Sequence, residues 1–161
     1  MNATLAELYQ GVILQHNDSP QNFGPLPDAT HHAALHNALC GDQITLRLRL
    51  TVPEPPGTPV IAQACFEGES CAVARASASL MTGMVIGQSP QQALALGERL
   101  RAFLQPGGPA PHKTGQTAPP PSTDDAGLGE LVALQGVRDV PSRLRCATLP
   151  WEALARALQN T

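Results

Sequence analysis

Aromatic and charged side chains are scarce in this chain of 161 residues. It holds one Trp, one Tyr and three Phe, and only 14% of its residues are charged. So few aromatic rings argue against a protein that stacks the bases of a single-stranded nucleic acid. The formal net charge of −3 likewise leaves little electrostatic attraction for phosphate backbones.

Long apolar runs and a basic leader are also missing. No stretch approaches the roughly 20 apolar residues that a helix needs to cross a bilayer. The segment from Met1 to Thr4 lacks the basic and apolar regions of a secretory signal. We therefore expect a cytoplasmic protein, in which structural disulfides are disfavoured. Its four cysteines then point to metal binding or catalysis, unless they are merely small buried apolar residues.

Glycine (14 residues) and proline (16 residues) are abundant, so long irregular segments are expected. The segment 105–126 holds six prolines and three glycines and has no apolar periodicity. It is predicted to be a loop or a flexible insertion. The chain length suits a single domain over 1–161 that contains this insertion.

Alternation of apolar and polar residues predicts a small antiparallel sheet. The segment 43–52 alternates strictly, which is typical of a half-buried strand with one wet face. A return strand is expected over 58–67, with residues such as Val60 and Ala62 on its buried face. A third strand over 31–38 is more weakly marked.

Apolar residues at helical spacing predict several helices. The expected helical segments are 3–16, 71–87, 90–104, 127–135 and 149–159. Ser70 is the candidate N-cap of the second of these helices. Because the strands come first and most helices follow, we predict an α+β fold with about three antiparallel strands packed by several helices.

Three short motifs place cysteines where the thiolate form is favoured. Cys40 and Asp42 flank a glycine just before the clearest strand, and glycine permits backbone angles that would turn both side chains toward one ion. Cys71 lies at a strand-to-helix junction, where the positive end of the helix dipole favours a thiolate. Cys146 follows two arginines, just ahead of the predicted last helix, and their charge favours its anion.

Together these motifs offer three sulfurs and one carboxylate oxygen, which would fill a tetrahedral zinc site. The four candidate ligands are Cys40, Asp42, Cys71 and Cys146. Such a site carries excess negative charge, which gives the adjacent Arg143 and Arg145 an electrostatic purpose. The spacings match no compact zinc finger, so the fold must bring the ligands together.

Simpler explanations exist for the individual residues. The string Cys40-Gly41-Asp42 also suits an ordinary turn that leads into a strand. His36, four residues before Cys40, is the least unlikely alternative ligand. Cys65 shares a strand face with polar residues and is predicted to be half-exposed and non-ligating. The remaining histidines are predicted to lie on the surface: His16, His31, His32 and His112.

Six strings occur in the order in which they are found in the IscU/SufU iron–sulfur assembly proteins. They are Leu8-Tyr9 with Val12-Ile13, Pro20-x-Asn22-x-Gly24, Asn37-Ala38-Leu39-Cys40-Gly41-Asp42, Phe66-x-Gly68-x-x-Cys71, Ala76-Ser77-Ala78-Ser79-Leu80-Met81 and Arg143-x-x-Cys146-Ala147-Thr148-Leu149-x-Trp151. The chain resembles this family over nearly its whole length except 105–126. It resembles the SufU branch most, because IscU proteins carry a histidine where this chain has Arg145.

The resemblance implies a compact domain with zinc held by the four candidate ligands. It also implies a SufS-like cysteine desulfurase as the partner, with Cys40 as the residue that accepts sulfur. The chain departs from the family's pattern at Gln10 and Gln21, where arginines are common. These changes concern the surface for the partner, whereas the four ligand positions are intact.

Three functional hypotheses follow. In the first, the protein is a zinc-dependent sulfurtransferase in which Cys40 accepts persulfide sulfur and Arg143 stabilises the Cys40 thiolate. In the second, it is a scaffold on which a labile [2Fe–2S] cluster is assembled and passed on, with cysteine and aspartate ligands. In the third, it is a zinc-stabilised interaction module without sulfur chemistry.

Overall fold

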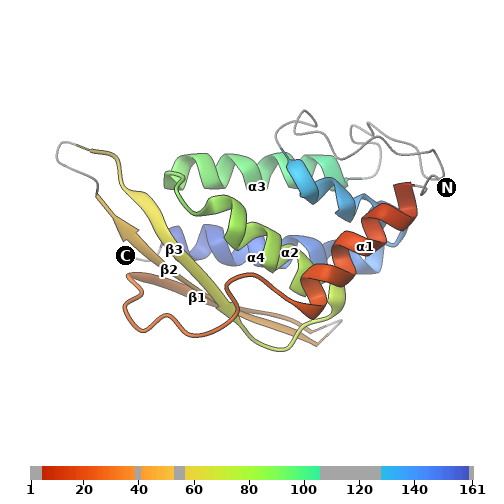
Figure 1. Cartoon of the computed structure of the whole chain (residues 1–161), viewed down its shortest axis with the longest axis horizontal. Helices are drawn as coiled ribbons and strands as arrows, with labels where there is room; N and C mark the ends of the chain where they lie inside the picture. The colour runs from red at the N-terminus through yellow and green to blue at the C-terminus, as the bar shows by residue number, and fades with distance from the viewer. Residues whose placement is uncertain (1–4, 39–40, 53–56, 106–127, 160–161) are drawn as a thin grey trace.

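A computed structural model describes residues 5–38, 41–52, 57–105 and 128–159 of the chain (Figure 1). The elements, in chain order, are α1 (Leu5–Asp18), β1 (His31–Asn37), β2 (Asp42–Thr51), β3 (Val60–Glu67), α2 (Ala72–Val85), α3 (Pro90–Leu104), the 3-10 helix η1 (Gly129–Asp139) and α4 (Pro141–Gln159). The predicted α+β fold with a three-stranded antiparallel sheet is confirmed. The weakly marked strand is present as β1.

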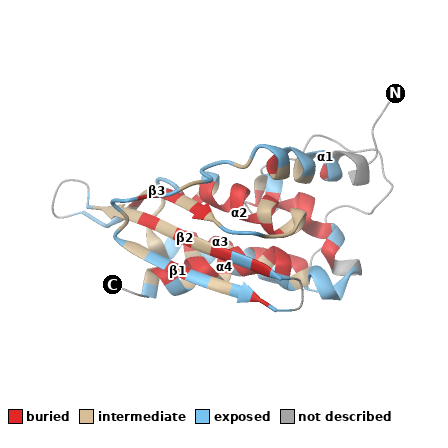
Figure 2. Cartoon of the chain, turned by 90° about the horizontal axis from the view of Figure 1, so that it is seen from below, coloured by how far each residue is buried: buried red, intermediate tan, exposed pale blue. Residues whose placement is uncertain are grey.

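The sheet has the order β1-β2-β3, and the described helices that pack on it cover one of its faces. Helices α2 and α4 pack on that face, and α3 lies beyond them, away from the strands (Figure 1). Along β2 the residues Ile44, Leu46 and Leu48 are buried, whereas Arg47 and Arg49 alternate with them and remain half-exposed. The outer face is therefore mostly exposed or half-buried, as Figure 2 shows.

The buried residues of β3 do not follow the simple alternation that its sequence predicts. Val60 and Ala62 were expected inside, but the buried residue at this end is Ile61. The pairing of β2 with β3 shifts between Arg49 and Leu50, which leaves Ala62 as an extra residue in β3. Such a bulge reverses the inside–outside alternation beyond it, so the prediction is wrong at this end of the strand.

Two helix starts also differ from the prediction. The N-cap of α2 is Cys71 instead of Ser70. Helix α4 begins at Pro141, well before the expected start, because proline is favoured in the first turn of a helix. Cys146 therefore lies inside α4 and not in a loop ahead of it. Pro150, one turn later, cannot donate a hydrogen bond to the carbonyl of Cys146.

The other predicted helices are present. Helices α1 and α3 match their predicted segments closely, and α3 begins with a capping box between Ser89 and Gln92. The last predicted segment before α4 is a 3-10 helix, η1. The predicted insertion at 105–126 lies, apart from Gln105, outside the described residues, so the single-domain boundaries stay a prediction.

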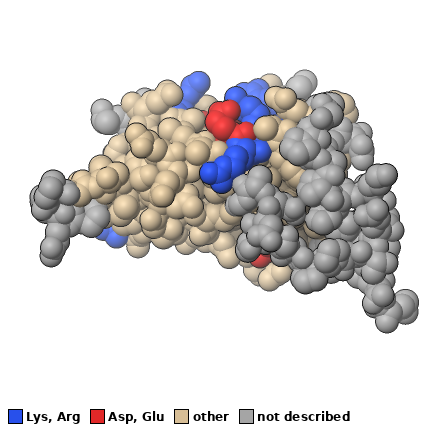
Figure 3. Space-filling view, turned by 90° about the horizontal axis from the view of Figure 1, so that it is seen from above, with Lys and Arg blue, Asp and Glu red and all other residues tan. Residues whose placement is uncertain are grey.

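Charges on the face that carries α3 do not gather by sign. Seen from the side of α3, basic and acidic side chains lie next to one another and most of the remaining described surface is uncharged (Figure 3). Glu98 and Arg101 of α3 form one such pair, with Nη1 and Oε1 3.9 Å apart. Within the described ranges, the helices are all too short or too polar to span a membrane.

Gly68 allows the loop before α2 to lie directly against β2. Its φ is +128°, and a Cβ atom there would lie 2.0 Å from the backbone oxygen of Gln43. We expect Gly68→Ala to lower the free energy of unfolding by at least about 3 kcal/mol, through backbone strain and this clash. Urea unfolding followed by circular dichroism measures the change.

Gly87→Ala is the matched control. Gly87 also has a positive φ, +89°, but no atom lies within 4 Å of its added Cβ. Only the cost of the left-handed backbone remains, about 1 kcal/mol. Equal losses in the two variants would contradict a role for the close approach of Gly68 to β2.

Candidate metal centre

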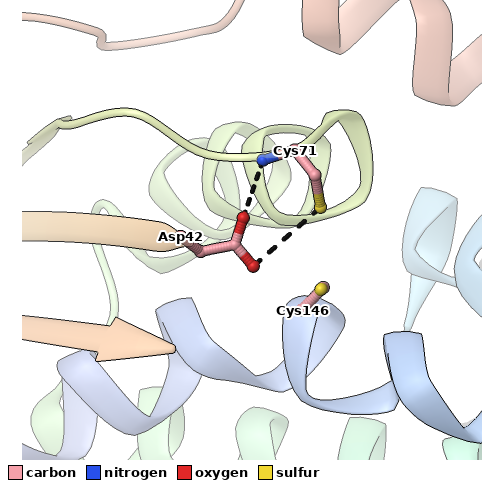
Figure 4. A group of neighbouring side chains, drawn as sticks. All are labelled: Asp42, Cys71 and Cys146. Atoms are coloured by element: carbon pink, nitrogen blue, oxygen red, sulfur yellow. Dashed lines mark hydrogen bonds between the residues drawn. The ribbon is translucent and has the colours of Figure 1, made fainter. Parts of the chain in front are cut away.

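Asp42, Cys71 and Cys146 come together from three separate elements (Figure 4). Asp42 is the first residue of β2, Cys71 caps α2, and Cys146 lies in the second turn of α4. One ligand atom from each residue lies within 4.8 Å of the other two. Asp42 is 1% exposed and Cys146 is 0% exposed, whereas Cys71 is half-buried. The group therefore reaches solvent on the side of Cys71.

The carboxylate of Asp42 connects the sheet to the start of α2. Its Oδ1 accepts a hydrogen bond from the backbone N–H of Cys71 at 2.8 Å, and its Oδ2 lies 4.0 Å from Cys71 Sγ. Cys71 itself provides no side-chain cap, so Asp42 satisfies a backbone donor at the helix N-terminus. The negative carboxylate also suits the positive end of the helix dipole.

Backbone contacts hold the loop before Cys71 against β2. The N–H of Gln43 donates to the carbonyl of Glu69 at 2.7 Å. The close approach of Gly68 to Gln43 lies in the same place. Asp42 and Cys71 are therefore fixed relative to each other by the main chain as well as by the carboxylate.

Ser77 holds α2 against α4. Its hydroxyl donates to the carbonyl of Ala147 at 2.6 Å and accepts a hydrogen bond from Trp151 Nε1 at 3.2 Å. All of these groups are buried, where each hydrogen bond is costly to lose. Because Ala147 follows Cys146, this network determines where the thiol of Cys146 lies relative to α2.

The side chains present fit a divalent metal that prefers thiolates. Two sulfurs and one carboxylate oxygen are the donor types of zinc sites. Ligand atoms of a tetrahedral zinc ion lie roughly 3.5 to 3.8 Å apart, so separations of up to 4.8 Å need only small side-chain adjustments. The fourth predicted ligand, Cys40, lies outside the described residues but only two positions before Asp42. Gly41, between them, has a φ of +73°.

The two arginines near Cys146 differ in their surroundings. Arg143 is exposed in the first turn of α4, and its spacing of three residues places it on the same side of the helix as Cys146. Arg145 is exposed, and its Nε lies 3.6 Å from Glu152 Oε2. Arg143 therefore lies on the side of α4 that carries Cys146.

Other candidates lie apart from the three ligands or play structural roles. His36 is exposed on β1 and is not among the described residues that form the group. His16 was predicted on the surface, and that prediction is wrong. It is 6% exposed, its Nδ1 lies 2.7 Å from Ser79 Oγ, and its Nε2 lies 3.6 Å from Glu130 Oε2. The cause is tertiary, because α2 and η1 pack against α1.

The histidines of β1 and the last histidine of the chain complete the set. His31 is half-buried and His32 is exposed, whereas His112 lies outside the described residues.

One residue near the centre had no role in the sequence analysis beyond its place in a motif. Asn37 is buried beside Cys146, and a polar residue that follows Ala33 and Leu35 on the same strand face is the signal that marks it.

Cys65 lies half-buried on the outer face of the sheet, opposite Arg47, as predicted. Burial raises the pKa of the Cys65 thiol, and the neighbouring Arg47 guanidinium offsets part of this shift. Iodoacetamide reacts with thiolates, so we expect half-maximal alkylation of Cys65 at a higher pH in the folded protein than in urea. Mass-spectrometric mapping as a function of pH measures both midpoints. Coincident midpoints would show that folding does not protect this thiol.

The chain is similar to known proteins over most of its length. Residues 8–147 match the model of the NifU-like N terminal domain. The zinc-dependent sulfurtransferase SufU of Bacillus subtilis (strain 168) is 34% identical over 157 residues, which cover 98% of this chain and 93% of that protein. The iron–sulfur cluster assembly scaffold protein IscU of Streptococcus pyogenes serotype M1 is 33% identical, covering 98% and 86%.

A solved structure supports the same relationship. The crystal structure of a protein described as an iron–sulfur cluster assembly scaffold for the SUF system, from Fervidobacterium islandicum AW-1, superposes with a TM-score of 0.70. It is 25% identical and covers 91% of this chain and 93% of its own. The fold therefore agrees with the sequence comparison, and the chain belongs to the NifU-like N terminal domain family, together with the SufU and IscU proteins.

Proposed function

We propose that the protein is a zinc-dependent sulfurtransferase of iron–sulfur cluster assembly, which accepts sulfur on Cys40 from a SufS-like cysteine desulfurase. The observation that carries the proposal is the convergence of Asp42, Cys71 and Cys146 within 4.8 Å. The similarity to the SufU of Bacillus subtilis, which is named for this activity, supports it.

Four residues would hold the metal in this proposal: Cys40, Asp42, Cys71 and Cys146. When bound, zinc keeps its thiolate ligands deprotonated at neutral pH. Asp42 is the one oxygen donor, and zinc binds thiolates more readily than carboxylates, so this mixed set is suited to ligand exchange. Asp42 is also anchored by the Cys71 N–H, so it keeps its place when another ligand changes.

The transfer itself needs no external oxidant or reductant. The Cys40 thiolate attacks the outer sulfur of a cysteine persulfide on the desulfurase. A sulfur–sulfur bond forms at Cys40, the sulfur–sulfur bond of the desulfurase breaks, and the desulfurase cysteine leaves as a thiolate. Arg143 stabilises the attacking Cys40 thiolate through a charge-assisted hydrogen bond. Asp42, Cys71 and Cys146 keep the rest of the centre together meanwhile.

Assembly of a [2Fe–2S] cluster is the second candidate function. It is favoured by the 33% identity to the scaffold IscU of Streptococcus pyogenes. Cysteine and aspartate can ligate such a cluster, and an incomplete thiolate set makes it labile. Arg145, which stands where IscU proteins have a histidine, weakens this candidate, because an arginine cannot replace an imidazole ligand.

Metal analysis separates the two candidates. We expect protein purified in air to be colourless and to contain about one zinc ion per chain. Elemental analysis and the visible absorption spectrum measure this outcome. A brown protein that contains iron and sulfide would instead support the scaffold.

Replacement of Cys40 tests the sulfur acceptor. We expect Cys40→Ala to abolish stimulation of a SufS-like cysteine desulfurase, because no thiolate remains to take the sulfur. Alanine release from cysteine measures the stimulation, and bound zinc is determined on the same samples. Cys65→Ala is the matched control and should stimulate normally, since Cys65 lies on the outer face of the sheet.

Normal stimulation by Cys40→Ala would overturn the proposed transfer. The interaction-module hypothesis predicts that outcome, together with unfolding of the domain when zinc is removed by a chelator.

A further inference from the structure

Asn37 occupies a core-facing position of β1 where an apolar residue is expected. The two preceding positions on that face are Ala33, which is buried, and Leu35, which packs against the core. Asn37 itself is 1% exposed. Burial of a carboxamide is unfavourable unless its polar atoms are hydrogen-bonded, so this side chain calls for a partner that explains it.

The partner lies in the metal centre. Asn37 Nδ2 donates to Cys146 Sγ at 3.9 Å, and both residues are buried. The backbone carbonyl of Asn37 accepts a hydrogen bond from the N–H of Gly41 at 2.8 Å, and Asn37 stands opposite Asp42 in the sheet. Asn37 thus connects a ligand on α4 with the turn that leads to Asp42.

An amide N–H that points at a thiolate has two physical effects. It orients the sulfur, and it stabilises negative charge there, which lowers the basicity and the nucleophilicity of the sulfur. The same effects recur where groups outside the ligand set tune metal-bound side chains. A buried N–H donor therefore makes the sulfur that accepts from it a weaker nucleophile than the same thiolate without the donor.

We infer that Asn37 is a positioning residue that holds Cys146 Sγ toward Asp42 and Cys71 and makes this thiolate a retained, poorly nucleophilic ligand. This inference rests on the proposed function, in which Cys40 is the cysteine that reacts. Asn37 thereby keeps Cys146 in place as a ligand while Cys40 reacts.

Two substitutions test the inference with zinc and cobalt(II) as probes. Asn37→Leu removes the donor at similar volume, and Asn37→Asp keeps the shape but places a carboxylate beside the sulfur. We expect both to bind zinc about 10- to 100-fold more weakly in competition with a chromogenic chelator. In the cobalt(II) form of Asn37→Leu, the sulfur-to-cobalt charge-transfer band should move to lower energy, because the sulfur is more electron-rich.

Alkylation gives a readout that would not change if Asn37 had only a structural role. We expect iodoacetamide to modify Cys146 faster, relative to Cys71, in zinc-loaded Asn37→Leu than in the unchanged protein. Peptide mapping by mass spectrometry measures the two rates. His36→Ala is the matched control, since His36 is the exposed neighbour of Asn37. It should leave the zinc affinity, the energy of the charge-transfer band and the alkylation rates unchanged.

The outcomes separate the inference from the function on which it rests. If the unchanged protein binds zinc but both Asn37 variants keep its affinity, band position and Cys146 reactivity, the inference is overturned and the proposed function stands. If the unchanged protein binds no zinc, the proposed function fails. The alkylation rates of the metal-free proteins then test the hydrogen bond between Asn37 and Cys146. A faster rate at Cys146 in Asn37→Leu would support this hydrogen bond, and equal rates would overturn it. Should Asn37→Leu not fold, as judged by circular dichroism, Asn37→Asp carries the same comparison.

Discussion

The hydrogen bond from the Cys71 backbone N–H to the Asp42 carboxylate is the interaction on which the centre depends. It joins the first residue of β2 to the N-terminus of α2, although 29 residues separate the two in sequence. A buried carboxylate is stable only where its charge is compensated, and here a backbone donor and the helix dipole contribute to that compensation. Asp42 therefore serves the fold and the candidate metal centre with the same side chain.

The remaining contacts bring α4 to this junction. Ser77 connects α2 to the backbone at Ala147, and Asn37 reaches the neighbouring Cys146 from β1. Both are buried polar side chains in a core that is mostly apolar. Buried hydrogen bonds of this kind favour one packing arrangement over others, which a centre assembled from three elements requires. Together these contacts leave Cys71 as the half-buried residue of the candidate centre, beside Asp42 and Cys146, which are buried.

Much of the fold could be predicted because the local spacing of apolar residues indicates the helices and strands. The strict alternation in β2 and the helical spacing in α1 and α3 both predicted the observed elements. Predictions were wrong where a long-range contact decides: the bulge at Ala62, the cap of α2, and the burial of His16 against Ser79. The apolar stripe over 149–159 predicts only the second half of α4, which begins at Pro141 because proline suits a first helical turn.

The sequence by itself determined which residues could bind a metal, since thiolates and a carboxylate near glycine turns and a helix start have that chemistry wherever the chain takes them. It also determined the family, through motifs whose order spans nearly the whole chain. Only the tertiary structure decided that Asp42, Cys71 and Cys146 meet and that Asn37 stands beside one of them. The physical reason is that these contacts join residues far apart along the chain, and the packing of α2 and α4 on the sheet, which no local pattern encodes, brings them within reach.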